Sequence, residues 1–239
     1  AFPVLSFPCV SLLGITVKEL ISDSELQAKG MKLVADRTDA LASVSFMDLS
    51  VEAECFGATV AVSDDEVPTV KGRLINDMDE AEALVVPAVG SGRTSLYINA
   101  IKSAVKEITD RPVLAGMIGP FSLAARLLDV SEIMIDCYDD PDMVHLVLDK
   151  ATQFLIEYAK AYKAVGAAGI MMAEPVSGLL SPSLEEEITL VVSLPQVEQN
   201  FESPSTFAPQ CLQNLVPFKP SETARAVVVT APLAISAVF

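Results

Sequence analysis

The sequence predicts an α/β fold in which apolar strands alternate with helices and lie in a parallel sheet. Residues 113–117 form an apolar run that leads directly into a helical pattern, and residues 169–174 form a second apolar run that ends at a carboxylate. Both runs are apolar on both faces, which is typical of parallel strands covered by helices. A doubly wound sheet and a (β/α) barrel both fit this pattern, and periodicity does not separate them.

The other elements of the amino-terminal half follow from local signals. Ser22 and the Asp after it are good N-caps, and Glu25 lies in capping-box reach of Ser22, so a helix is expected there. Gly57 closes a short helical turn. The expected elements are a first strand over 3–8, a helix over 22–36, a strand over 43–49, a helical turn over 51–57 and a strand over 59–65.

The carboxyl-terminal half of the α/β pattern has clearer boundaries. Asp140-Pro141 opens a long helix with an acid at its start and Pro in its first turn, and Gly166 ends it. Residues 78–86 and 93–108 read as two earlier helices.

The junction after residues 113–117 is a candidate binding element. Gly119 carries no Cβ, so backbone there can approach a ligand, and Pro120 suits the first turn of a helix. The free N–H groups at that helix start face whatever lies above the strand. We expect Gly119, Phe121 and Ser122 to contact a substrate or cofactor; an ordinary strand-to-helix turn is the alternative.

Composition excludes several function classes. The chain has 239 residues, 51% of them apolar, which is enough for one large domain with a sizeable core. Its net charge of −16 argues against nucleic acid or an anionic membrane as a partner, because both need clustered Lys and Arg. The four scattered cysteines form no CxxC pair and indicate reduced thiols in a cytoplasmic protein. There is no signal-peptide pattern and no run of about 18 apolar residues, so no membrane span is expected.

Two acidic residues are the candidate catalytic groups. Asp48 ends the strand over 43–49, and Glu174 ends the strand over 169–174. A carboxylate at the carboxyl end of a buried parallel strand is where barrel active sites draw their groups, and it could act as acid or base or hold a cationic nitrogen. If both carboxylates lie at the same open end of a barrel, their different environments would give them different pKa values. A helix cap is the alternative role for Asp48.

Other candidates are weaker. His145 is the single histidine and lies within a helical pattern, so it reads as a packed or surface residue, and multi-His metal sites are excluded. Cys211 has no His or Cys at ligand spacing and reads as a plain apolar cysteine. Arg93 follows a Gly-Ser-Gly turn that resembles a loose anion-binding loop, but a solvated arginine is the expectation.

The last part of the chain differs in character from the rest. All 11 glycines lie at or before Gly178, and residues 188–239 contain neither Gly nor Asp. Because βα units need Gly at turns and helix ends, we expect a barrel portion over 1–187 and an atypical tail over 188–239. The tail is either irregular, an added piece, or the product of a reading-frame change.

Four strings together resemble the uroporphyrinogen decarboxylase superfamily, and within it the methylcobamide:coenzyme M methyltransferase branch. They are MDLSVEAECFGATV, DDEVPTVKGRLI, RPVLAGMIGPFSLAARLL and the stretch from DDPDMVHLVLDK to VSGLLSP. The resemblance runs from about Pro3 to Pro182 and implies a TIM (β/α)8-type barrel, which we expect to be incomplete here. It also implies a methyltransferase that moves a methyl group from a methylcobamide, on a corrinoid protein or free, to a small thiol.

The resemblance has clear departures. It places Asp48 at the aspartate that binds pyrrole nitrogens in the decarboxylases, but the arginine-bearing segment that grips propionates has no counterpart, so tetrapyrrole decarboxylation is the alternative function. The methyltransferases bind zinc through a His-x-Cys pair and a further Cys, and this sequence has no His-x-Cys. We therefore expect no metal ligands here, and a truncated, inactive enzyme or a non-catalytic corrinoid-binding protein remains open.

Overall fold

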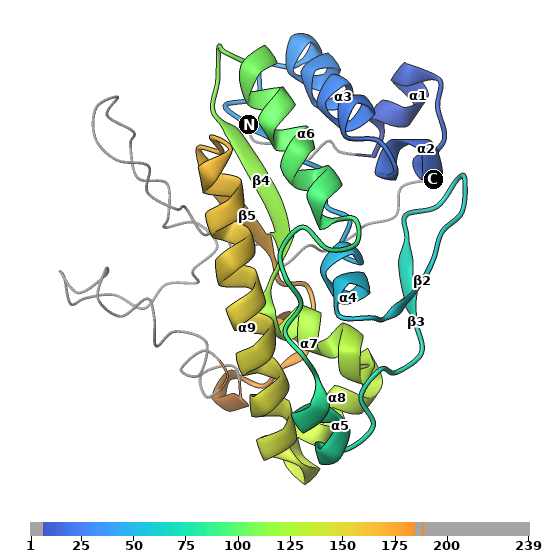
Figure 1. Ribbon diagram of the computed structural model, residues 1–239, viewed down its shortest axis with the longest axis vertical. Coiled ribbons are helices and arrows are strands. Elements are labelled where there is room, and N and C mark those ends of the chain that lie inside the picture. The colour runs from blue at the N-terminus through green and yellow to red at the C-terminus, as the bar shows by residue number, and fades with distance from the viewer. Residues whose placement is uncertain (1–6, 185–187, 189–239) are drawn as a thin grey trace, which may run out of the picture.

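Three parallel strands form the centre of the fold (Figure 1). The computed structural model describes residues 7–184 and 188. The strand order is β1–β4–β5, with Ser43 opposite Val113 and Ile118 opposite Ala173. Because the strands are parallel, their carboxyl ends meet at one edge of the sheet. The bounds are β1 Ser43–Val44, β4 Val113–Ile118 and β5 Gly169–Ala173.

Helices pack on this sheet and on one another. α3 packs against α6, and α7 packs against both α8 and α9, while α6 runs alongside β4 in Figure 1. The helices are α1 Cys9–Leu13, α2 Val17–Ile21, α3 Ser24–Arg37, α4 Val51–Cys55, α5 Met78–Ala83, α6 Thr94–Glu107, α7 Pro120–Leu128, α8 Val130–Asp139, α9 Pro141–Ala164 and the 3-10 turn Ser177–Leu179. Rings along α9 fill the core, with Phe154, Tyr158 and Tyr162 fully buried and successive centroids 5.7 and 4.5 Å apart.

The strongest local signals of the sequence are confirmed. Gly119 is the N-cap of α7 and Pro120 its first residue. The Asp140 side chain accepts a hydrogen bond from the Met143 N–H at 3.3 Å at the start of α9. After α9, Gly166 adopts a φ of 100°, which only glycine takes without strain.

The strand predicted over 59–65 is not part of the parallel sheet. Residues Thr59–Ala61 (β2) pair in antiparallel fashion with Thr69–Lys71 (β3), so they form a separate hairpin. Most of these residues are exposed. The acidic run between the two strands, residues 64–66, is the exposed loop of this hairpin and explains why the chain turns back there.

The strand predicted over 43–49 pairs over two residues only. After Val44, the Ser45 hydroxyl accepts the N–H of Gly116 at 2.7 Å and replaces the backbone carbonyl in the ladder. A Cβ atom on Gly116 would lie only 2.7 Å from the Met47 sulfur, so the Met47 side chain packs directly against this glycine. Side chains therefore occupy the space that regular strand pairing would need.

The capping box predicted between Ser22 and Glu25 is wrong, whereas Asp23, the other N-cap that the sequence offers, is confirmed. Its Oδ1 accepts the N–H groups of Glu25 at 2.7 Å and Leu26 at 3.1 Å at the start of α3. A capping box does occur one helix earlier, between Thr16 and Glu19.

Some predictions fall on residues outside the described ranges. The strand over 3–8 is described only at Phe7 and Pro8, which form a turn. The tail over 188–239 is described only at Ile188, which is buried, so its division from the barrel portion stays a prediction. Within the described ranges the parallel strands do not close into a ring, and no helix there has both the length and the apolarity to span a membrane.

Candidate functional site

The two predicted carboxylates lie at the same edge of the parallel sheet. Asp48 follows the carboxyl end of β1, and Glu174 directly follows the carboxyl end of β5. Both interact electrostatically with Arg126 of α7. We use the name carboxyl-end cluster for Asp48, Glu52, Arg93, Arg126 and Glu174.

Asp48 is held by the protein on both carboxylate oxygens. Its Oδ1 accepts the Ser50 hydroxyl at 2.6 Å and the Ser50 N–H at 3.1 Å, just before α4. Its Oδ2 accepts the Tyr97 hydroxyl at 2.9 Å and a hydrogen bond from Arg93. Burial, with the nearby Asp48 charge, raises the pKa of Tyr97 well above its usual range, so this tyrosine remains a donor.

The sequence predicts a solvated side chain for Arg93. The structure shows instead that Arg93 is part of this site. Its guanidinium pairs with Asp48 and Glu54 and donates to the Ser50 hydroxyl at 2.9 Å. The Arg93 side chain is 14% exposed and that of Asp48 is 0% exposed. Burial disfavours the charged guanidinium, but the Asp48 carboxylate more than offsets this and raises the pKa of Arg93.

Glu174 closes the amino end of α7. Its Oε1 accepts the N–H of Ser122, which lies in the first turn of the helix. A Cβ on Gly119 would lie 1.6 Å from Glu174 Oε2, so only glycine permits this approach. The space beside Gly119 is thus occupied by the Glu174 side chain, and the predicted contact of Gly119 with a ligand stays a prediction. Burial raises the pKa of Glu174 to about 7, although the hydrogen bonds from Ser122 oppose that shift.

Phe121 and Ser122 are both buried in the first turn of α7. The Ser122 hydroxyl accepts the N–H of Val176 at 3.1 Å and ties the segment after β5 to this helix. Their predicted contact with a ligand stays a prediction.

Glu52 is a site residue that the sequence analysis missed. It lies in α4 with 2% of its surface exposed, and its Oε1 accepts the Ile118 N–H at 3.2 Å at the end of β4. Its Oε2 is buried and has no hydrogen-bond partner among the described residues. Burial raises the pKa of Glu52 to about 7, with a smaller contribution from the charge of Asp48. The one available signal was its position four residues after Asp48, on the turn that follows the strand.

Arg126 is the second missed residue. It lies in the last turn of α7, and its Nη1 donates to the Ser122 carbonyl at 3.0 Å. Burial lowers the pKa of Arg126, while the carboxylates of Glu52, Glu174 and Asp48 raise it, in that order. A half-buried cation thus lies near three carboxyl groups.

The zinc site that the resemblance implies does not fit the described residues. They contain no group of three or more His, Cys, Asp and Glu side chains arranged to hold a metal ion. Cys9 and Cys137 are buried cysteines, Cys55 is partly buried, and His145 is partly buried on α9. Cys211 lies outside the described residues.

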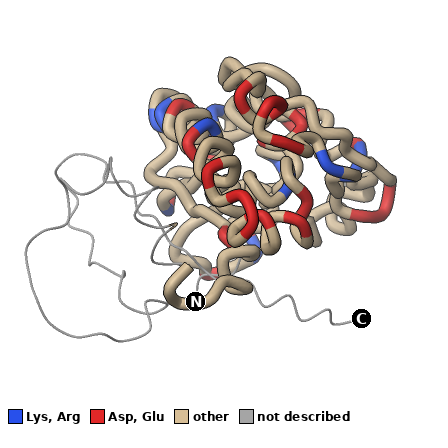
Figure 2. The backbone as a smooth tube through the Cα atoms, turned by 90° about the horizontal axis from the view of Figure 1, so that it is seen from below, with Lys and Arg blue, Asp and Glu red and all other residues tan. Residues whose placement is uncertain are grey.

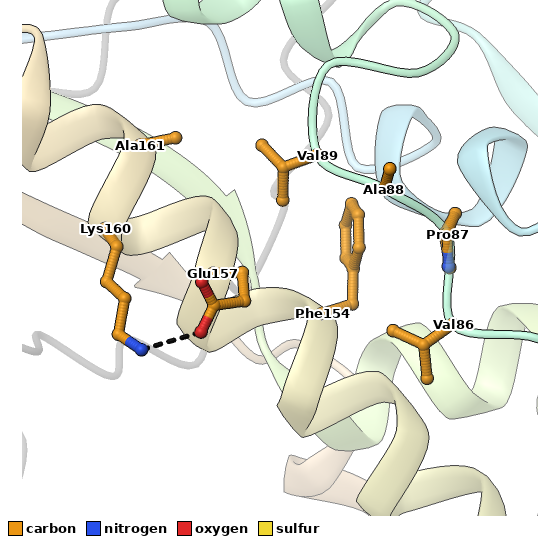
Figure 3. A pocket seen from close by; sticks show the side chains of 8 residues that line it. All are labelled: Val86, Pro87, Ala88, Val89, Phe154, Glu157, Lys160 and Ala161. Carbon is orange, nitrogen blue, oxygen red and sulfur yellow. Dashed lines mark hydrogen bonds and ion pairs between the residues drawn. The ribbon is translucent and has the colours of Figure 1, made fainter.

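Two surface features lie apart from the carboxyl-end cluster. A groove of about 520 Å³ lies between α9 and residues 86–89, with Phe154 at its base and the Glu157–Lys160 ion pair (2.6 Å) at its edge (Figure 3). No member of the cluster lines it. Acidic residues predominate on the face shown in Figure 2 and are spread over several segments.

Comparisons with known proteins support the resemblance. The sequence model "Uroporphyrinogen decarboxylase (URO-D)" matches residues 9–199. A methylcobamide:CoM methyltransferase of Methanosarcina acetivorans is 30% identical over 132 residues, covering 54% of this chain and 39% of that protein. A uroporphyrinogen decarboxylase of Psychromonas ingrahamii is 26% identical over 161 residues, covering 64% of this chain and 45% of that protein.

A solved structure agrees with these sequence relatives. A methyltransferase from Methanosarcina mazei has a TM-score of 0.69 and 28% sequence identity, over 75% of this chain and 55% of that one. The chain thus spans less than half the length of the two curated relatives above. The likeness confirms the predicted α/β class with a parallel sheet of the barrel-type methyltransferases. Since the family match spans most of its residues, the chain belongs to the uroporphyrinogen decarboxylase family.

Proposed function

We propose that this chain supplies part of a site that moves a methyl group from a methylcobamide to a small thiol. The observation that supports this most is the carboxyl-end cluster, in which the buried Glu52 and the half-buried Glu174 carry carboxyl groups that act on Arg126. Relatives of this family include methylcobamide:CoM methyltransferases from two Methanosarcina species, which supports a corrinoid and a thiol as substrates. The corrinoid would be free or held by a corrinoid protein.

The chemistry that this chain's residues supply is proton transfer. A carboxyl group with a pKa near 7 is half ionised at neutral pH, which suits it to act as a base. Glu174 takes the proton from the thiol S–H, and the thiolate sulfur then attacks the methyl carbon. The carbon–cobalt bond breaks, its electron pair stays on cobalt, and the product is a methyl thioether. Because the described residues do not fit zinc, no step is assigned to a metal ion of the protein.

The engagement of Asp48 favours methyl transfer over tetrapyrrole decarboxylation. In the decarboxylases the matching aspartate binds pyrrole nitrogens, and here both oxygens of Asp48 already accept hydrogen bonds from Ser50, Tyr97 and Arg93. A pyrrole N–H would have to displace one of these buried bonds, at a cost comparable to an unsatisfied polar group.

The test is a methyl-transfer assay with methylcobalamin and coenzyme M, followed by the visible absorption of the corrinoid. We expect demethylation by the full chain, and a loss of about tenfold or more in rate for Glu174→Gln, the size typical of a lost general base. Glu157→Gln is the matched control, because Glu157 is an exposed carboxylate on α9. The wild-type rate should rise with pH through about 7, as Glu174 ionises.

Three outcomes would contradict the proposal. Corrinoid binding without demethylation would identify a non-catalytic corrinoid-binding protein. Release of carbon dioxide from uroporphyrinogen would identify a decarboxylase. Equal rates for Glu174→Gln and Glu157→Gln would remove Glu174 from the mechanism.

A further inference from the structure

Arg126 differs from the other buried or half-buried arginines of the described chain in its partners. Arg73, Arg93 and Arg111 each reach a carboxylate within 4.0 Å. Arg126 reaches none within that distance in the described residues, and the one hydrogen bond of its guanidinium there goes to the Ser122 carbonyl at 3.0 Å. A guanidinium has five N–H donors in a planar fork that matches an oxygen anion, so most of its binding capacity is unused.

Glu52 provides a second, independent sign of a missing partner. It is fully buried, one oxygen accepts the Ile118 N–H, and the other has no hydrogen-bond partner in the part of the chain that the structure describes. Buried polar atoms are almost always hydrogen-bonded, so an orphaned carboxyl oxygen points to a group that is absent from this chain. Arg126 interacts electrostatically with Glu52 more strongly than with any other residue.

The charges around Arg126 indicate the sign of the charge that a ligand at this site would carry. Arg93 neutralises Asp48, which leaves the cation of Arg126 with two carboxyl groups, Glu52 and Glu174. When both are protonated, the half-buried guanidinium of Arg126 carries an unbalanced positive charge. A ligand cation would be repelled by it, whereas a ligand anion would compensate it.

We propose that Arg126 binds an anionic oxygen group of the substrate, a carboxylate or a sulfonate, and that Glu52 takes up a proton when that group binds. The inference rests on the proposed function, because it takes the carboxyl-end cluster to be the substrate site, but its test requires no methyl transfer. The titratable and charged groups that face Glu52 come from every side of the cluster: Asp48 after β1, Cys55 on α4, Arg126 on α7, and Tyr158 and Tyr162 on α9.

The test compares two thiols that differ only in charge. 3-Mercaptopropionate and 3-mercaptopropanol are titrated into the full chain, and binding is measured by ligand-observed NMR at about pH 6 and about pH 8.5, on either side of the titration of Glu52. At the lower pH the carboxylate should bind at least about tenfold more tightly than the alcohol, the usual size for a hydrogen bond between charged groups. This preference should shrink at the higher pH, where Glu52 and Glu174 compete for Arg126.

Variants assign the preference to its residues. Arg126→Gln should abolish it, and Arg126→Lys, which keeps the charge without the fork, should reduce it. Glu52→Gln should preserve the preference at the higher pH, because one competing charge is removed. The matched control is Arg111→Gln, since Arg111 lies before β4 at the opposite end of the sheet and donates there to the carbonyls of Thr38 and Ala40; it should retain the preference.

Two results would overturn the inference: equal affinities for the two thiols in the wild type, or a preference that survives Arg126→Gln. If Arg126→Gln does not fold, an undiminished preference in Arg126→Lys overturns it equally. A charge preference that depends on Arg126 in a chain without demethylation activity would uphold the anion site and reject methyl transfer. Demethylation without any charge preference would do the reverse.

Discussion

Replacing Glu52 by Gln should stabilise the protein at alkaline pH and leave it nearly unchanged in acid. Glu52 is fully buried, and its pKa is raised from 4.5 to about 7 by desolvation. The folded state therefore binds this proton more tightly than the unfolded state does. The stability that the proton confers is complete below pH 4.5 and is lost as the pH rises through about 7. Glutamine has nearly the same shape and carries no charge, so its burial does not depend on pH.

The magnitude follows from the pKa difference. A shift of one pKa unit corresponds to about 1.4 kcal/mol, so the shift of Glu52 corresponds to about 3 kcal/mol between mildly acidic and mildly alkaline pH. With a urea m-value of roughly 2 kcal/mol per molar, the unfolding midpoint of Glu52→Gln should exceed that of wild type by roughly 1 to 2 M at about pH 8. At about pH 4, below the unfolded pKa of 4.5, the two midpoints should nearly coincide.

The assay is equilibrium urea unfolding of both proteins over this pH range. Glu157→Gln is the control, and its difference from wild type should be small at every pH because exposed ion pairs contribute little. A difference for Glu52→Gln that does not change with pH would refute the reasoning. It would mean that Glu52 is ionised in the folded protein over the whole pH range, stabilised by a counter-charge or a bound water molecule.

Two further substitutions test the packing and the charge of the site. Gly119→Ala should lower the free energy of unfolding by about 2 to 4 kcal/mol, because its Cβ would lie 1.6 Å from Glu174 Oε2 and break the cap of α7. The control Gly178→Ala should be nearly neutral, because a Cβ there would meet open space. Equal costs for the two variants would reject the close packing at Gly119. Arg93→Gln should lower the free energy of unfolding by about 3 kcal/mol, because it leaves Asp48 buried without its counter-charge. Adding Asp48→Asn should recover part of that loss. Strictly additive effects in this double-mutant cycle would show that the pair does not interact.

The sequence predicts those parts of the fold that depend on neighbouring residues. The start of α7 at Gly119-Pro120 and the start of α9 at Asp140-Pro141 are as expected, because caps and proline positions act within one turn of chain. Their positions also fix where β4 ends and where Glu174 must meet the helix start. The placement of Asp48 and Glu174 at one edge follows from the same logic, since parallel strands share their carboxyl end.

The parts that the sequence does not predict depend on partners far along the chain. The Ser45 hydroxyl that interrupts β1 bonds to Gly116, and Arg93 reaches Asp48 across 45 residues. From residue type alone, Glu52 and Arg126 would be expected on the exposed surface of their helices, because Glu and Arg are almost never fully buried unless paired. Only the three-dimensional packing of α4 and α7 against the strand ends reveals that Glu52 is buried and that Arg126 is half-buried.

The hydrogen bonds of the two carboxylates determine which of them can move a proton. Asp48 accepts hydrogen bonds on both oxygens and pairs with Arg93, so neither of its oxygens is available to a substrate without breaking a buried contact. Glu174 accepts the Ser122 N–H on Oε1 and has a pKa raised to about 7, which suits it to exchange a proton at neutral pH. We therefore expect the pH profile of methyl transfer to flatten in Glu174→Gln. In Asp48→Asn the activity should fall through loss of the Arg93 and Tyr97 contacts, while the shape of the pH profile remains. A profile that flattens in Asp48→Asn instead would exchange the roles of the two carboxylates.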